Sequence, residues 1–150
     1  METGLKNLKE VFGLKDMNLR TYSPLTLAYI GDGVYELIVR TVLVKRGNCP
    51  VNRLHKQASS LVKAASQSAM MEVLEPMLTE EEAGVYRRGR NAHSPTMAKH
   101  ATMSDYRRAT GFEALIGYLY LKEDFTRMTE LVHAGLTAQE LAIKEKRKNE

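Results

Sequence analysis

The sequence predicts one all-α domain, and three observations support this fold class. Apolar residues recur at intervals of three and four along most of the 150 residues, which is the period of amphipathic helices. Alternating polar and apolar runs, the pattern of half-buried strands, are almost absent. Ser, Thr, Asn or Asp precedes several of the apolar segments, where such residues cap helices. We expect a single domain over residues 1–150, with an N-terminal extension over about 1–20 and a charged tail over about 142–150.

Two helices are expected in the first third of the chain. Apolar residues between positions 5 and 12 form a short amphipathic pattern that ends at Gly13. Ser23 followed by Pro24 is a strong helix start, because a hydroxyl cap precedes a proline at the first helical position. This second helix should continue to the residue before Gly47. It is apolar on most sides, so we expect it to be central and buried.

The remainder of the chain is expected to form four more helices, separated by turn signals and one loop. They are a helix that Asn52 caps and that ends before Pro76, a short helix opened by the capping box of Thr79 and Glu82, a helix capped by Ser104 or Asp105, and a last helix over about 124–141. Residues 91–103 are expected to form the loop that precedes the third of these.

Composition and charge restrict the class of protein. Lys and Arg number 22 against 18 Asp and Glu, and the net charge of +4 permits a polyanionic partner without requiring one. One cysteine, Cys49, excludes an intrachain disulfide framework and fits a reducing compartment. The first residues carry charges where a signal peptide needs an apolar core, and Glu36 and Arg40 interrupt the most apolar stretch. We therefore expect a soluble, cytoplasmic protein.

Asp32 stands in the predicted second helix with a glycine on each side. Gly31 and Gly33 lower helix stability by about 1 kcal/mol each relative to Ala. Glycines at these positions let another backbone or a ligand approach the carboxylate. The alternative is that Asp32 caps a broken helix and the glycines mark the break.

Glu113 lies in the otherwise apolar segment TGFEALIG, with small residues nearby. A carboxylate in such surroundings is unfavourable unless it is paired or bound to a cation. The alternative is a buried ion pair with Arg40 or Arg107. Two carboxylates from two buried helices would form a hard-oxygen site for Mg²⁺, which can activate water and neutralise charge on a phosphate.

Four segments resemble the ribonuclease III family. AYIGDGVYE is similar to the family's signature helix, with its pattern E-x-L-G-D-A, and TGFEALIGYLYL is similar to its second acidic helix. NRLHKQASSLVKAASQ and RRGRNAHS stand between them, in family order. The wording LAYIGD, LHK and RGRNA resembles the Mini-ribonuclease III branch, which consists of the nuclease domain without a double-stranded-RNA-binding domain.

The resemblance implies an all-α ribonuclease III endonuclease domain, a helical bundle that forms a two-fold homodimer. It also implies Mg²⁺-dependent cleavage of double-stranded RNA, with Mn²⁺ able to substitute, leaving 5′-phosphate and 3′-hydroxyl ends. In bacteria this branch matures the ends of the 23S ribosomal RNA precursor. A large-subunit ribosomal protein is a further partner that the resemblance leaves open.

Carried over by position, the resemblance makes Asp32 and Glu113 catalytic Mg²⁺ ligands. Two further family acids are missing, since Ala28 and Thr110 stand at their positions, and the short branch shares these losses. Glu36, one helical turn beyond Asp32, would be a third ligand, or else a salt-bridged or exposed glutamate.

The candidate RNA contacts are small polar and basic residues, because duplex RNA is read mainly through phosphates and 2′-hydroxyls. They are Arg88, Arg90, Asn91, Ser94 and Lys99, with His55 and Lys56 as further candidates. A solvated helix end is the alternative for the arginines, and packing near a dimer interface for His55 and Lys56. The apolar excess on the second helix, including Tyr29, Val34 and Leu37, favours an interface between two copies of the chain.

Two other function classes compete with the nuclease. The first is a catalytically silent dimeric protein that binds structured RNA on ribosomes, favoured by the two missing acids. The second is a helical DNA-binding regulator, which needs a recognition helix with a basic outer face, and no segment fits that description well.

Overall fold

The computed structural model describes residues 2–92 and 102–150, and every regular element within them is helical. The predicted all-α fold class is therefore confirmed. The elements are α1 (Glu2–Phe12), the short 3-10 helix η1 (Leu19–Thr21), α2 (Pro24–Lys45), α3 (Val51–Val62), α4 (Ala64–Leu74), the 3-10 helix η2 (Glu75–Met77), α5 (Glu80–Asn91), α6 (Met103–Leu121) and α7 (Phe125–Lys148).

Helix α2 begins and ends where its capping residues predict. The Ser23 hydroxyl accepts a hydrogen bond from the Thr26 amide at 3.1 Å, and Pro24 occupies the first helical position. Gly47 follows the helix with φ +146, a value that L side chains rarely adopt. The helix is continuous through Asp32, so the alternative in which Asp32 caps a break is wrong.

The prediction of a single helix over residues 52–75 is wrong. The helix is interrupted at Lys63, whose backbone is extended (ψ 155). Side chains from α4 stabilise the break by bonding carbonyls at the end of α3. The Ser66 hydroxyl donates to the Ser60 carbonyl at 2.5 Å, and Gln67 Nε2 donates to the Val62 carbonyl at 3.0 Å. Pro50, not Asn52, is the residue before the first turn of α3.

The cap of α5 is the predicted one, whereas the cap of α6 is a different residue. The capping box at Thr79 and Glu82 is present in both directions, at 3.2 and 2.9 Å. Helix α6 is capped by Thr102, whose hydroxyl accepts from the Asp105 amide at 3.0 Å, so the prediction of Ser104 or Asp105 as the cap is wrong.

Helix α7 continues to Lys148, seven residues past its predicted end at position 141. Three basic residues in its last turn favour the longer helix, because cations stabilise the negative end of a helix dipole.

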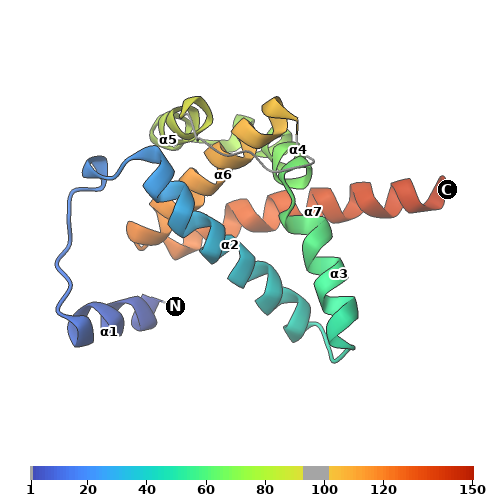
Figure 1. The fold of residues 1–150 in the computed structure, drawn as a ribbon, viewed down its shortest axis with the longest axis horizontal. Helices are drawn as coiled ribbons and strands as arrows, with labels where there is room; N and C mark the ends of the chain where they lie inside the picture. Colours follow the sequence, from blue (N-terminus) through green and yellow to red (C-terminus); the bar gives the residue numbers. More distant parts are fainter. Residues whose placement is uncertain (1, 93–101) are drawn as a thin grey trace.

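Helix α6 is the centre of the fold, and α2, α4 and α5 pack against it (Figure 1). Ala114, Leu115 and Ile116 of this helix are fully buried. Tyr35 of α2 meets Phe112 of α6 edge to face, with ring centroids 4.9 Å apart. The segment of α6 that carries Glu113 is thus held between three other helices.

One face of α2 is not covered by the rest of the chain. Tyr29 is 83% exposed and Leu37 is 55% exposed, whereas Val34 is buried in the core. Helix α2 is thus central and buried on one side, as expected, while this second side is left uncovered within one copy of the chain.

Helix α1 lies to one side of the body (Figure 1), where the Lys9 ammonium contacts the Glu123 carboxylate at 2.9 Å. Within residues 2–92 and 102–150, each helix is too short or too polar to cross a membrane.

Candidate active site

The site begins at the crossing of α2 and α6, where two glycines bring the backbones into contact. A Cβ on Gly31 would lie 1.7 Å from the Glu113 carbonyl oxygen, and a Cβ on Gly117 would lie 2.0 Å from the Leu27 carbonyl oxygen. Any side chain at either position would push the helices apart. Gly33, by contrast, faces open space, with nothing within 4 Å of an added Cβ. Of the two glycines beside Asp32, only Gly31 is required for the close approach of α6.

This crossing brings Asp32 and Glu113 together from two helices. Glu113 in its protonated form donates a hydrogen bond to the Asp32 carboxylate, and Asp32 lies at the exposed edge of the pair. Burial, together with the hydrogen bond to Asp32 and the charge of that residue, raises the pKa of Glu113 to about 9. The alternative of a buried ion pair between Glu113 and Arg40 or Arg107 is wrong. Arg40 contacts Glu36, and Asp32 is the charged residue that acts on Glu113.

A small cavity adjoins Glu113 on the side of α4. Its volume is about 160 Å³, and its lining includes Gln67 of α4 together with Tyr106 and Thr110 of α6. The Thr110 hydroxyl donates to the Tyr106 carbonyl at 3.0 Å. Glu113 thus borders a cavity that is large enough for water and that is partly lined by neutral polar side chains.

The acid pair fits a hard divalent cation by its chemistry. Glu113, which burial keeps protonated beside Asp32, would ionise if a cation balanced its charge. Among the described residues no group of three or more His, Cys, Asp or Glu side chains has metal-binding geometry. Glu36 is instead paired with Arg40 at 2.8 Å, and the side chains of Ala28 and Thr110 are neutral. A cation here would have two protein carboxylates and would retain several waters.

The raised pKa of Glu113 predicts how stability depends on pH. Between pH 4.5, the ordinary value, and about 9, the folded state keeps a proton that the unfolded state loses, so stability without metal falls as pH rises. Glu113→Gln removes this term, and we expect it to stabilise the metal-free protein by at least about 1 kcal/mol at pH 8, with a smaller gain at pH 5. Urea denaturation at both pH values measures the difference. Equal gains at the two pH values would contradict the raised pKa.

The basic candidates near the end of α5 lie on two different faces. Arg88 is exposed and lines a pocket of about 490 Å³, whereas the Arg90 guanidinium lies over the Tyr86 ring at 5.6 Å from its centroid. Asn91 is the exposed last residue of α5. Ser94 and Lys99 lie outside the described residues.

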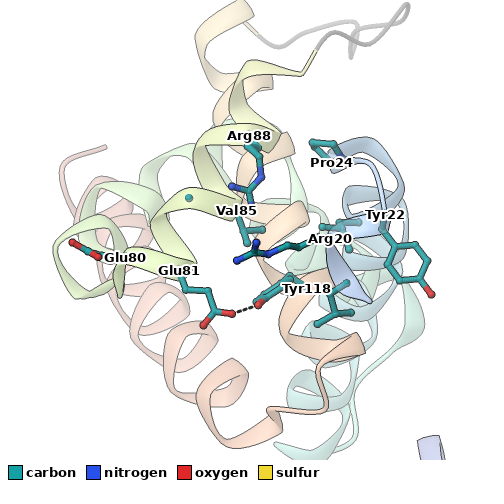
Figure 2. Close-up of a pocket in the computed structure, with 11 residues that line it drawn as sticks. Arg20, Tyr22, Pro24, Glu80, Glu81, Val85, Arg88 and Tyr118 are labelled. Atoms are coloured by element: carbon teal, nitrogen blue, oxygen red, sulfur yellow. Dashed lines mark hydrogen bonds between the residues drawn. The ribbon is translucent and has the colours of Figure 1, made fainter. Parts of the chain in front are cut away.

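Figure 2 shows the pocket that Arg88 lines, between η1, the start of α2, α5 and α6. Arg20 of η1 enters it from the opposite side, and the Tyr118 hydroxyl donates to the Glu81 carboxylate at its base. Burial and the contact with Glu81 raise the pKa of Tyr118 to about 12, while the positive charges of Arg20 and Arg88 act in the opposite direction. The sequence analysis missed Arg20, because nothing local distinguishes it from other surface arginines.

His55 and Lys56 are exposed on α3, on another part of the surface. His55 borders an apolar groove of about 200 Å³ with Val44 of α2 and Val51 and Leu54 of α3. The other residues that line this groove are apolar except for Arg40.

Comparisons with known proteins show the family to which the fold belongs. The family model described as the Ribonuclease III domain matches residues 25–124, a range that includes Asp32 and Glu113. Mini-ribonuclease 3 of Clostridium tetani is 47% identical over 126 residues, covering 83% of this chain and 82% of the relative. Mini-ribonuclease 3 of Symbiobacterium thermophilum is 48% identical over 118 residues, covering 79% of this chain and 91% of the relative.

A solved structure shares the fold. The crystal structure of a protein from Fusobacterium nucleatum superimposes with a TM-score of 0.73 at 28% identity, covering 80% of this chain and 96% of that one. The fold, the family match and the named relatives define an endoribonuclease. The chain belongs to the ribonuclease III family, together with relatives named Mini-ribonuclease 3.

Proposed function

We propose that this endoribonuclease hydrolyses double-stranded RNA with a divalent cation, Mg²⁺ or Mn²⁺, held by Asp32 and Glu113. The observation that carries the proposal is the contact between these two acids at the glycine crossing of α2 and α6. The buried carboxyl of Glu113 reduces the stability of the metal-free protein. A catalytically silent protein would carry this cost without any benefit from the contact.

The two acids have different tasks in this proposal. Glu113, on the buried side, would have to lose its proton to hold the cation. Asp32, at the exposed edge, would hold the cation where a duplex in solution can reach it. The bound cation would supply an activated water and neutralise charge on the scissile phosphate. Hydrolysis in this class would leave 5′-phosphate and 3′-hydroxyl ends.

The uncovered apolar face of α2 supports a homodimer. Tyr29, Leu37 and Val44 follow one another at helical spacing and are each more than half exposed, and Val51 of α3 extends the same apolar surface. A second copy related by a two-fold axis would cover this face with its own. Two sites in one dimer would then allow one cut in each strand of a duplex.

The substrate we propose is a double-stranded segment of the 23S ribosomal RNA precursor, processed in the cytoplasm, with a large-subunit ribosomal protein as a further partner. The relatives named Mini-ribonuclease 3 support a ribonuclease of this type. Free Cys49 is compatible with a reducing compartment.

Cleavage by the wild-type protein tests this function against the silent RNA-binding protein, the second candidate, which the neutral residues Ala28 and Thr110 favour. We expect an end-labelled RNA duplex to be cut with Mg²⁺ and left intact with EDTA. A DNA duplex and a single strand of the same sequence are the controls. Binding of the RNA duplex without cleavage, in Mg²⁺ and in Mn²⁺ and with ribosomal precursor RNA, would establish the silent binding protein instead.

Arg88 and Arg20 are expected to contact phosphates, because both guanidinium groups border one open pocket and neither has an ion-pair partner among the described residues. We expect Arg88→Gln to weaken duplex binding by about 3- to 10-fold and to reduce the slope of log K against log salt by about 1. Lys6→Gln on α1 makes the same charge change elsewhere on the exposed surface and should leave binding unchanged. Equal effects of the two variants would show a general charge effect.

A further inference from the structure

Gln67 has a buried carboxamide whose orientation is fixed by one hydrogen bond. The residue is 2% exposed, and its Nε2 donates to the Val62 carbonyl at 3.0 Å across the break between α3 and α4. This bond assigns the nitrogen to one side of the amide and leaves Oε1 on the other. Oε1 is buried and has no hydrogen-bond partner in the described structure.

Gln67 lines the same cavity as Glu113. The cavity of about 160 Å³ has room for water beside the carboxyl group, and its remaining walls come from α3, α4 and α6. Gln67 is thus the polar residue of α4 that borders the proposed cation site. It also borders Thr110, the position that is neutral in this chain.

A buried amide oxygen without a donor is unfavourable, and native structures normally satisfy such groups with protein or ordered water. The missing partner must be a hydrogen-bond donor. A divalent cation with two protein carboxylates keeps several waters, and a coordinated water donates hydrogen bonds strongly. A neutral oxygen can orient such a water without adding negative charge to the acid pair.

We propose that Gln67 is a positioning residue for the cation: its Oε1 accepts a hydrogen bond from a water in the shell of the ion held by Asp32 and Glu113. This inference rests on the proposed function. It assigns to a neutral side chain on α4 the task of orienting the ion's waters.

The test is Mn²⁺ binding measured by calorimetry without RNA, on the wild type, Gln67→Met and Gln67→Glu. Met has a similar shape but no acceptor oxygen, and we expect about 10- to 100-fold weaker binding. Both substitutions remove the Nε2 bond to the Val62 carbonyl, so the difference between them reports on the acceptor oxygen. Glu keeps an acceptor oxygen and adds charge, so binding should be at least as tight as in the wild type. Gln139→Met is the matched control, because Gln139 also bonds a side chain of α4, Ser66 at 3.2 Å, but does not line the cavity.

Thermal melting without metal, run on each variant, separates folding from binding. Weaker Mn²⁺ binding by folded Gln67→Met, with Gln139→Met unchanged, supports the proposal, and wild-type affinity in Gln67→Met overturns it. If Gln67→Met does not fold, Gln67→Glu decides, because a loss of affinity there contradicts the role of an acceptor oxygen. If the wild type itself binds no Mn²⁺, the proposed function fails and this inference fails with it.

Discussion

Glu113→Gln is expected to reduce cleavage of an RNA duplex by about 10³-fold or more while the protein remains folded, and Asp32→Asn should do the same. Each substitution removes one of the two carboxylates that would hold the cation but preserves the shape of the side chain. Single-turnover cleavage at saturating enzyme measures the loss. Circular dichroism and sedimentation of each variant verify that fold and assembly are kept.

Glu36→Gln is the matched control for the two acid variants. Glu36 lies one turn from Asp32 on α2, and its carboxylate is already paired with Arg40 at 2.8 Å. We expect it to retain cleavage within about threefold of the wild type, because the ion pair is largely exposed to solvent. A loss as large as that of Glu113→Gln would place a third acid in the site, and normal cleavage by Glu113→Gln would remove the acid pair from the reaction.

The second large effect is expected for Gly31→Ala. Its added methyl would lie 1.7 Å from the Glu113 carbonyl oxygen, and the backbone of α6 cannot yield without moving Glu113. We expect destabilisation of about 3 kcal/mol or more, measured by urea denaturation, together with loss of cleavage.

Gly84→Ala on α5 provides the contrast. A Cβ there meets the Arg88 Nη1 at 3.3 Å, the far end of a flexible side chain. Because alanine favours the helix by about 0.5–1 kcal/mol over glycine, this variant should be neutral or stabilised. A similar small effect of Gly31→Ala would show that the crossing can open, and that contact between the backbones does not fix the acid pair.

Local signals predicted the fold where a side chain acts on its own helix end. Ser23 with Pro24, and Thr79 with Glu82, are caps whose hydrogen bonds lie within four residues, and both helices begin where these signals stand. The break at Lys63 was missed, because it depends on Ser66 and Gln67 bonding carbonyls of the preceding helix. Such bonds have no periodic signature in a sequence.

The two acids could be predicted from the sequence because each stands out from its neighbours along the chain. A carboxylate among apolar and small residues is conspicuous, and the resemblance to ribonuclease III supplied the pairing of Asp32 with Glu113. Arg20 and Gln67 were missed, because each reaches its pocket through the tertiary arrangement alone. The structure places Val34 in the core, whereas the sequence predicts it at an interface. Helix α2 is apolar on most sides, so its pattern does not distinguish the core face from a neighbouring exposed face.

The most direct test of the acid pair is Mn²⁺ titration of the wild type, Asp32→Asn and Glu113→Gln at pH 7, in buffers of different ionisation enthalpy. Protonated Glu113 has to ionise on binding, so the wild type should bind the cation and release up to about one proton per site. Both variants should lose that binding. Cation binding that persists unchanged in Glu113→Gln, with no proton released by the wild type, would contradict a metal site made by Asp32 and Glu113.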